Sequence, residues 1–171
     1  SCFYSEISIE YTVTSTSCEL NCDGIIDNGT NCACTSDTYG GHTYLFCDEA
    51  KTWHNARSAC QSYGNFDLAV ITDSSENSWI RNTAQSVAGG YWWWFGYENM
   101  GAANWQEPYA GWSWVNGSNS WYTNWNGGQP DDYWGNEDCG HMYGSSGRWN
   151  DLDCNINNWY GSYVYFICEE L

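Results

Sequence analysis

The sequence predicts an α+β fold with two helices, small antiparallel sheets and one long loop, preceded by a disulfide-rich segment. Two stretches repeat apolar residues at helical spacing, and short aromatic-rich runs beside them alternate like strands. From about residue 98 to residue 154, Gly, Asn and Trp interleave without a regular period. Ten cysteines occur in 171 residues, and this density is typical of disulfide-linked proteins from an oxidising compartment.

The N-terminal segment, residues 1–38, contains five of the ten cysteines and few apolar residues. Cross-links must therefore hold it together, because it cannot build a core. A strand is expected at residues 6–14. The cysteine order loosely resembles an epidermal-growth-factor-like module, which implies the pairs Cys2 with Cys22, Cys18 with Cys32, and Cys34 with Cys47. Spacing alone cannot choose among the possible pairings.

The main domain is expected to span residues 39–171 and to begin with an aromatic strand at residues 41–46. A helix follows between Glu49 and Tyr63, where Trp53, Ala56 and Cys60 recur at helical spacing before Gly64.

A second helix begins near residue 74, where Asp73 and Ser74 are candidate N-caps. Glu76 lies in its first turn, Ile80 marks its apolar face, and the pair at 89–90, two glycines, ends it.

The run at residues 92–97, Trp-Trp-Trp-Phe-Gly-Tyr, predicts a buried strand. Such aromatics could form a sugar-stacking platform, but core packing is the favoured interpretation. Residues 112–117 alternate like a strand that ends in a turn, residues 121–125 lead toward a proline turn, and residues 163–168 form a closing strand.

Charge excludes several classes of partner. Four basic residues stand against 21 acidic ones, giving a net charge of −17, so nucleic acid and membrane insertion are not expected.

No apolar stretch is long enough to cross a bilayer. The N-terminus carries no signal peptide, and we interpret the chain as a mature, secreted, extracellular protein. Asn28 and Asn116 have the form of glycosylation acceptors.

The stretch at residues 129–139, Gln-Pro-Asp-Asp-Tyr-Trp-Gly-Asn-Glu-Asp-Cys, is followed by Trp-Asn-Asp at residues 149–151. Its carboxylates and amides lie close together without amines, and Cys139 and Cys154 bracket the second part. Calcium prefers such oxygen ligands, whereas zinc prefers His and thiolates. The stretch therefore predicts a calcium site.

Three motifs in this order, Gln-Pro-Asp at 129–131, Glu-Asp-Cys at 137–139 and Trp-Asn-Asp at 149–151, resemble the sugar-binding loop of C-type lectins in its galactose-type variant. The likeness extends over about residues 40–171. The resemblance implies a cis bond before Pro130 and a principal calcium held by Gln129, Asp131, Glu137, Asn150 and Asp151. It implies that the sugar is bound by Gln129, Asp131, Glu137 and Asn150, with Tyr133 or Trp134 stacking on it. Relatives commonly carry Trp at position 133, so which ring stacks is left open.

Two further calcium sites follow from the same resemblance. An auxiliary site would use Asp132, Glu137 and Asp138, completed by Glu98, Asn99 and Asn104. A structural site would use the Val70 carbonyl, Glu76 and Glu169. For the structural site, an ordinary pair of surface glutamates is an equal alternative.

The resemblance also implies that Cys60 pairs with Cys168 and Cys139 with Cys154. The chain departs from the family's long form at Thr43, where a cysteine is expected, and has Cys47 after the aromatic residues instead. Pairing of Cys34 with Cys47 is one interpretation, and an interchain bond is the other.

The expected function is calcium-dependent binding of galactose or N-acetylgalactosamine through the 3- and 4-hydroxyls, on glycans that end in these sugars. The alternative is a domain that binds a protein, mineral or ice surface and uses calcium only to brace its loop.

Paired carboxylates also occur in glycosidases, but calcium would keep these acids ionised, and His42, His54 and His141 belong to no catalytic motif. An enzyme is therefore not expected. One shallow site needs multivalency, which favours a homo-oligomer.

Overall fold

The computed structural model describes residues 19–20, 26–27, 34–101, 108–159 and 161–171. The expected strand at residues 6–14, the cysteines at 2, 18, 22 and 32, and both Asn28 and Asn104 lie outside the described residues. The predicted growth-factor-like pairing of the first cysteines therefore stays a prediction.

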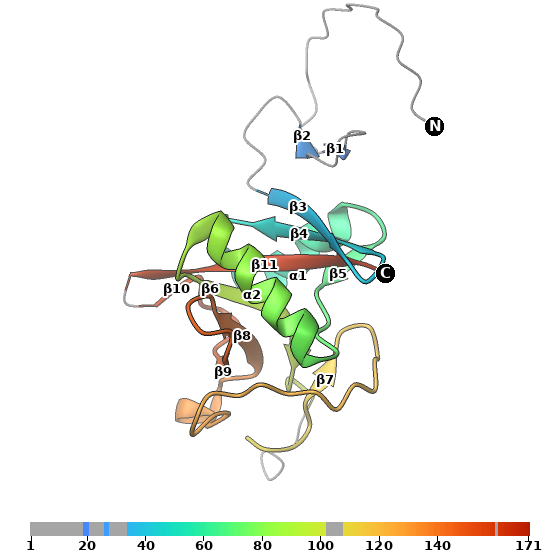
Figure 1. The fold of residues 1–171 in the computed structure, drawn as a ribbon. Helices are drawn as coiled ribbons and strands as arrows, with labels where there is room; N and C mark the ends of the chain where they lie inside the picture. The colour runs from blue at the N-terminus through green and yellow to red at the C-terminus, as the bar shows by residue number, and fades with distance from the viewer. Residues whose placement is uncertain (1–18, 21–25, 28–33, 102–107, 160) are drawn as a thin grey trace, which may run out of the picture.

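Nine strands form the main sheet, and its central order is β3-β4-β11-β6-β8-β9 (Figure 1). β5 and β10 pair with β11, and β7 pairs with β6. The bounds are β3 Cys34–Tyr39, β4 His42–Cys47, β5 Phe66–Leu68, β6 Trp92–Glu98, β7 Ser113–Trp114, β8 Cys139–Tyr143, β9 Trp149–Leu152, β10 Asn158–Trp159 and β11 Ser162–Glu170. A separate pair consists of β1 Glu19–Leu20 and β2 Ile26–Asp27.

The strand pairing differs from the expected small antiparallel sheets in two respects. The strands of residues 34–171 join into one network, and β6 runs parallel to β11, with Trp93 opposite Tyr165. A parallel neighbour needs a long crossover connection, here the entire loop region between residues 98 and 162. The sequence gives no direct sign of which distant strands will be neighbours.

The two helices match the expected positions and lie on opposite faces of the sheet. α1, Trp53–Ser62, begins at the Thr52 cap, and α2, Ser74–Ala88, begins where Asp73 accepts the N–H groups of Ser75 and Glu76. α2 ends at Gly89, whose φ of 66° favours glycine. Figure 1 shows α2 crossing the front of the sheet.

Side-chain alternation along the strands divides the core into two layers. Leu45 and Trp94 pack with α1 residues on one face. Tyr44, Trp93 and Phe95 pack with α2 residues on the other face. Trp93, Trp94 and Phe95 are therefore core, as predicted, while Trp92 is partly buried and packs against it.

β3 was not expected as a strand, yet it pairs with β4 along six residues, from Cys34 opposite Cys47 to Tyr39 opposite His42. Its sequence, Cys-Thr-Ser-Asp-Thr-Tyr, has hardly any apolar side chains, because most of the strand is only partly buried. The last residues of the expected N-terminal segment thus belong to the main sheet, while the division of the chain into two parts stays a prediction.

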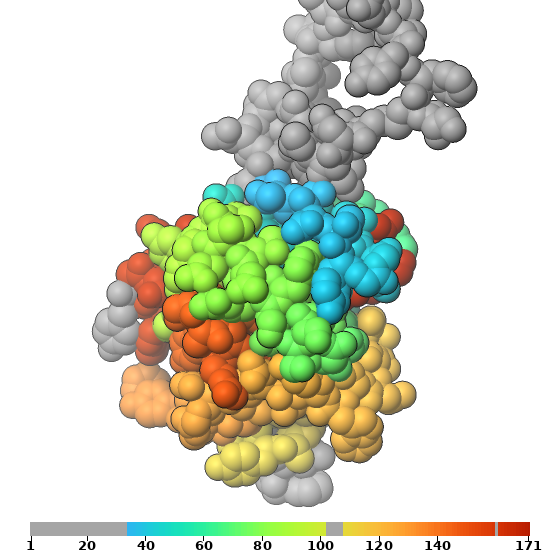
Figure 2. All heavy atoms as spheres, viewed as in Figure 1, coloured from blue at the N-terminus to red at the C-terminus, as the bar shows by residue number. Residues whose placement is uncertain are grey.

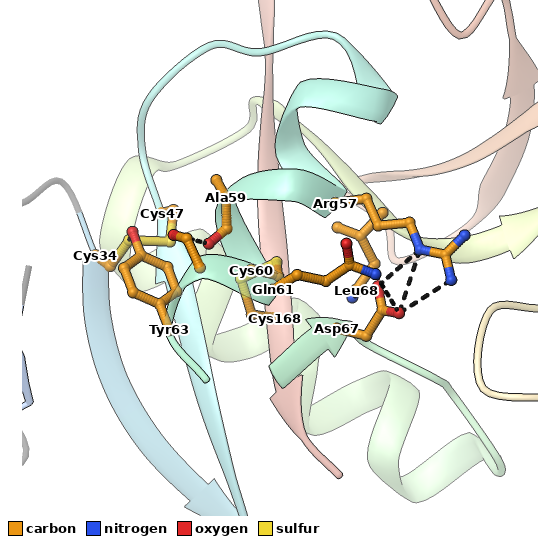
Figure 3. Close-up of a disulfide and its surroundings, with 11 residues drawn as sticks. Cys34, Cys47, Arg57, Ala59, Cys60, Gln61, Tyr63, Asp67, Leu68 and Cys168 are labelled. Carbon is orange, nitrogen blue, oxygen red and sulfur yellow. Dashed lines mark hydrogen bonds and ion pairs between the residues drawn. A yellow bond between two sulfur atoms is a disulfide. The ribbon is translucent and has the colours of Figure 1, made fainter. Parts of the chain in front are cut away.

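Three disulfides cross-link the described chain: Cys34–Cys47, Cys60–Cys168 and Cys139–Cys154. All three are the pairs expected from the sequence, and Cys34 with Cys47 is bonded within the chain. The first two appear in Figure 3, where Cys60 joins α1 to Cys168 of β11.

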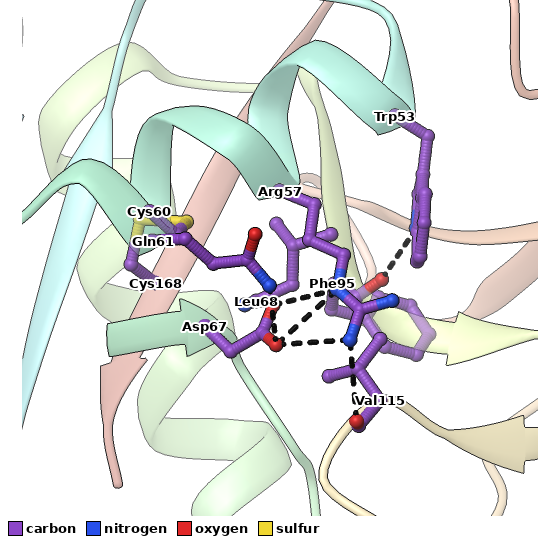
Figure 4. Close-up of polar contacts among 9 residues, drawn as sticks. All are labelled: Trp53, Arg57, Cys60, Gln61, Asp67, Leu68, Phe95, Val115 and Cys168. Atoms are coloured by element: carbon purple, nitrogen blue, oxygen red, sulfur yellow. Dashed lines mark hydrogen bonds and ion pairs between the residues drawn. A yellow bond between two sulfur atoms is a disulfide. The ribbon is translucent and has the colours of Figure 1, made fainter. Parts of the chain in front are cut away.

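Beside the Cys60 bond, Arg57 forms a fork on Asp67. Its Nε lies 3.0 Å from Oδ1, and its Nη2 lies 3.1 Å from Oδ2 and donates to the Val115 carbonyl at 3.3 Å (Figure 4). Asp67 is buried and the Arg57 side chain is 32% exposed, so this partly buried pair holds α1 against β5. In the part of the chain that the structure describes, no helix is long and apolar enough to span a membrane.

Candidate functional site: an acidic loop

The loop at residues 129–137 is held against β9 by backbone hydrogen bonds. Gln129 and Pro130 are joined by a cis peptide bond, as the resemblance implied. After this turn, the N–H groups of Asp131 and Asp132 donate to the carboxylate of Asp151, at 3.0 and 2.7 Å. Asp151 is fully buried in β9, so the rigid sheet determines the position of the loop.

A 3-10 turn, Tyr133–Gly135, then brings the chain back so that Glu137 faces Asp131. Glu137 donates its N–H to Asp132 Oδ1 at 3.1 Å and accepts the Tyr133 N–H at 3.2 Å. Asp132 and Trp134 have φ values of 44° and 65°, which non-glycine residues rarely adopt. Such backbone persists only where the surroundings impose it, which is common at functional sites.

Carboxylate oxygens of Asp131, Glu137 and Asp151 all lie within 4.8 Å of one another. The pKa of Glu137 is raised to about 7, chiefly by burial and also by the charges of Asp151 and Asp131, while the hydrogen bond from the Tyr133 N–H opposes the rise. Burial also raises the pKa of Asp151. Among the described residues, no ion pair involves this cluster. Three acids gathered without a basic partner favour a bound cation.

Two amides complete the set of oxygens. Gln129 Oε1 is buried and has no hydrogen-bond partner, and such an orphaned oxygen usually has a missing partner. Asn150 is buried, and its Nδ2 donates to the Asp151 carbonyl, which leaves its side-chain oxygen as an acceptor. Carboxylates and amide oxygens without thiolate or imidazole suit calcium. The residues present therefore fit this ion.

The aromatic pair on the loop is exposed. Tyr133 and Trp134 are 53% and 79% exposed, and their ring centroids are 4.7 Å apart in a stacked arrangement. Exposure of this size is unusual for Trp. Both rings are therefore open to solvent beside the acidic cluster.

The expected auxiliary site is partly assembled. Asn99 is buried, its Oδ1 has no hydrogen-bond partner, and its N–H donates to the Asp138 carbonyl. Burial raises the pKa of Asp138, and the charges of Asp132, Asp153 and Glu98 raise it further. Glu98 accepts hydrogen bonds from Met100 and Ser113. Asn104 lies outside the described residues.

Sequence reasoning missed Asp153, which accepts Asn136 Nδ2 at 3.0 Å. The acidic side chain just before Cys154 was the available signal.

The expected structural site lies in a separate pocket of about 320 Å³ that Val70, Glu76 and Glu169 line. Both carboxylates are buried and already have donors. Glu76 accepts from Thr72 and Tyr44, and Glu169 accepts from the Val70 N–H at 2.8 Å. Burial raises the pKa of Glu169, and the Glu76 charge adds to the effect. The residues come together, and their role stays a prediction.

A sheet with one helix on each face and an acidic loop fastened by Cys139–Cys154 define the C-type lectin class of domain. The model of the Lectin C-type domain family matches residues 49–170, and the chain belongs to this family. Its members are non-enzymatic binding proteins, and the prediction that the chain is not an enzyme is confirmed on this ground.

Two curated relatives illustrate the similarity. A perlucin-like protein of Mytilus galloprovincialis is 38% identical over 130 residues, covering 74% of this chain and 78% of the relative. C-type lectin domain family 4 member M of Nomascus concolor is 32% identical over 144 residues, covering 81% of this chain. The chain spans only 32% of the length of that second relative.

Among solved structures, the C-type lectin CEL-I of Cucumaria echinata superposes with a TM-score of 0.65 at 26% identity, covering 78% of this chain and 93% of that one. Human lithostathine superposes with a TM-score of 0.63 at 21% identity, covering 78% and 95%. At that identity the second comparison shows the fold alone.

Proposed function

We propose that the protein is a calcium-dependent lectin that prefers galactose and N-acetylgalactosamine. The observation that carries the proposal is the convergence of Asp131, Glu137 and Asp151 within 4.8 Å, beside the unpartnered oxygen of Gln129. The ligands of the ion would be Gln129, Asp131, Glu137, Asn150 and Asp151. Calcium held there would keep open coordination positions that two vicinal sugar hydroxyls can fill.

The side chains around the ion would determine which sugar fits. Asp131 and Glu137 would accept hydrogen bonds from the two hydroxyls, while the amide N–H groups of Gln129 and Asn150 would donate hydrogen bonds to the hydroxyl oxygens. Each hydroxyl thus needs one acid and one amide, so the order of amide and acid selects the arrangement of hydroxyls. This chain has the galactose-type order, in which the amide of Gln129 precedes the acid of Asp131. That order fits an axial 4-hydroxyl beside an equatorial 3-hydroxyl.

An exposed ring supplies the remaining contact. Galactose has an apolar face of C–H groups that packs against an aromatic plane, and Tyr133 and Trp134 both present rings to solvent beside the cluster. We propose that one of them stacks on the sugar. Substituting each ring in turn with Ala identifies it, since only the stacking ring should matter for galactose retention.

Chromatography on galactose-agarose tests the proposal directly. The protein should be retained in millimolar calcium and eluted by chelator, because the carboxylates cannot hold sugar without the ion. A mannose column run in parallel is the control for selectivity. Passage through the galactose column in calcium would contradict the proposal.

A paired substitution tests the selectivity. Gln129→Glu with Asp131→Asn reverses the order of acid and amide, so retention should move from the galactose column to the mannose column. The reversed pair keeps the charge and the oxygen count of the loop, so calcium-induced thermal stabilisation should survive. An unchanged sugar profile would show that selectivity resides elsewhere.

The acid excess favours a second candidate function. A net charge of −17 gives the molecule a field suited to cationic surfaces, so it could bind a mineral or a basic protein and use calcium only to brace the loop. Adsorption to a calcium mineral that galactose does not displace, together with passage through galactose-agarose, would support this function over the first.

We also propose that the protein is secreted and forms homo-oligomers. The disulfides require an oxidising compartment, and several shallow sites on one particle raise avidity. Light scattering of the protein secreted from eukaryotic cells tests both points, and a strictly monomeric secreted species would contradict the second.

A further inference from the structure

The four cations of the chain divide into two kinds. Lys51 pairs with Glu49 and Arg57 pairs with Asp67. Arg81 and Arg148 form no ion pair with a carboxylate anywhere in the described chain. In a chain with 21 acidic residues, two arginines without acidic partners are unexpected.

Both unpaired arginines line one hollow of about 430 Å³ between α2, the β8–β9 turn and the segment around Asn124. Figure 2 shows these three parts meeting on one face, where the green spheres of α2 adjoin the orange spheres of the turn and the lighter orange spheres of the preceding segment. No acidic side chain lines the hollow, and its other lining residues are uncharged and polar except Tyr122.

The hollow is held in shape by Gly147. Its carbonyl accepts Asn77 Nδ2 at 3.1 Å and Asn124 Nδ2 at 2.7 Å, so one oxygen joins α2 to the 124 segment. Gly147 has a φ of +73°, and a Cβ there would lie 3.1 Å from Arg81 Cγ. The arginine stem therefore packs directly on the turn.

Both guanidinium groups are positioned by neutral oxygens. Arg81 Nη2 donates to the Ser145 carbonyl at 2.7 Å, and Arg148 Nη1 donates to Asn124 Oδ1 at 3.0 Å. Arg81 Nε is buried and has no acceptor. Arg81 Nη1 also donates to Asn82 Oδ1 at 2.9 Å. A guanidinium carries five N–H donors, so each group keeps donors beyond these contacts with neutral oxygens.

One acid near the hollow, Asp73, is engaged at the N-terminus of α2. The charges of Arg148 and Asp73 act in opposite directions on the pKa of Tyr122, which burial raises, so both charges lie near this ring. The Asp73 carboxylate, however, accepts the N–H groups of Ser75 and Glu76 as the cap of α2. Its Oδ1 is thus engaged by the backbone of α2, and in the described chain no ion pair joins Asp73 to either arginine.

We infer that this hollow is a second, calcium-independent binding site that takes the sulfate monoester group of an acidic glycan. Paired guanidinium forks match the oxygens of a tetrahedral anion. A sulfate monoester carries one negative charge, whereas a phosphate monoester carries about −1.5 to −2, so the acidic protein repels sulfate less. The choice of a sugar as carrier rests on the proposed lectin function, but the anion site does not.

Arginine side-chain NMR tests this site in the full chain. With ¹⁵N-labelled protein in chelator, titration with methyl sulfate or galactose 6-sulfate should shift the Nε–H signals of Arg81 and Arg148 in a saturable way. Arg57, bound to Asp67, serves as an internal control and should stay in place. Galactose without sulfate should leave all three signals unchanged. Equal shifts of all three arginines, or none, would overturn the inference.

Substitution provides an independent check. Arg148→Gln, at an exposed position, should weaken binding of galactose 6-sulfate by about tenfold, whereas Lys51→Gln removes the same charge elsewhere and should leave the affinity unchanged. Equal losses in both variants would indicate only a general charge effect and refute the site. Because the titration runs without calcium, failure on galactose-agarose leaves the anion site standing, and the reverse also holds.

Discussion

Glu137 combines partial burial, neighbouring acids and a raised pKa with a candidate role as a calcium ligand. Its carboxyl is half-buried beside two other acids, and its pKa of about 7 lies well above the ordinary 4.5. A cation would compete with a proton for this group, because only the ionised carboxylate is a good ligand. Sequence motifs identified the residue, but the raised pKa follows from burial, which only the fold reveals.

The raised pKa predicts a pH-dependent calcium affinity. Below about pH 7 each pH unit should weaken binding by up to about tenfold, since Glu137 must release its proton first. Calorimetric titration with calcium at several pH values measures this slope. Glu137→Gln should bind more weakly and with a flatter pH profile. A wild-type affinity that is constant from pH 8 to about pH 5 would contradict the assignment.

The same shift predicts how stability changes with pH in chelator. The folded state binds the Glu137 proton more tightly than the unfolded chain, so its contribution is greatest below about 4.5 and falls as pH rises through about 7. Added calcium should therefore raise the melting temperature more at high pH than at low pH. Scanning fluorimetry with and without calcium checks this, and a calcium effect that grows toward low pH would have the wrong sign.

Asp67 shows a different use of a buried acid. It accepts Arg57, Gln61 Nε2 at 3.2 Å and the Leu68 N–H at 2.8 Å. Asp67→Ala should lower the free energy of unfolding by about 1–3 kcal/mol, because the buried Leu68 N–H and the partly exposed guanidinium lose their acceptor. Glu49→Ala, which breaks the exposed pair with Lys51, should cost less than about 1 kcal/mol. Urea denaturation compares them, and equal losses would show that burial of the pair is not what matters.

At the scale of elements, the helices could be predicted because their signals are local. Asp73 and Gly89 define the ends of α2 by capping chemistry. β3 could not be predicted, since its half-exposed polar residues gain their role only by pairing with β4. β7 is shorter than the alternation at residues 112–117 suggested and contains only Ser113–Trp114. Pairing across the sheet depends on distant partners, and local patterns do not encode it.

The close surroundings of Gly96 predict that β6 cannot accept a larger side chain at this position without loss of stability. A Cβ at this position would lie 2.5 Å from Val115 Cγ2 and 2.7 Å from the Leu68 carbonyl oxygen. Gly96→Ala should therefore destabilise the protein by about 1–3 kcal/mol through overpacking. Gly127→Ala is the matched control, because open space surrounds that position. Chemical denaturation of both variants checks the difference, and a stable Gly96→Ala protein would mean that the sheet can separate from its neighbours.

At the scale of the whole molecule, the candidate calcium site could be predicted well because its residues are close in sequence. The proposed anion site in the hollow beside α2 could not be predicted, since Arg81 and Arg148 lie far apart in the chain and carry no motif. Their significance arises from what the fold places around them and from the acids that it keeps away. Three-dimensional convergence of scattered side chains is the part that sequence patterns do not contain.

Two of the disulfides should differ in what their removal changes: one should affect stability alone, and the other should affect both stability and calcium binding. Cys60–Cys168 closes a separation of 108 residues, whereas Cys139–Cys154 closes only 15. Removing the first with paired Cys→Ala substitutions should cost about 4–5 kcal/mol and removing the second about 3 kcal/mol, on the chain-entropy model. Only the second removal should also weaken calcium binding in protein that is still folded. Denaturation combined with calcium titration measures both effects, and the opposite pattern would contradict this division.

β11 lies between β4 and β6 in the middle of the sheet, although it is the last strand of the domain. During translation, the two flanking strands are therefore made long before the element that fills the gap between them. The sheet therefore cannot be completed until about residue 170 has left the ribosome. Until then the apolar surfaces of β4 and β6 that β11 will cover are exposed and prone to aggregation.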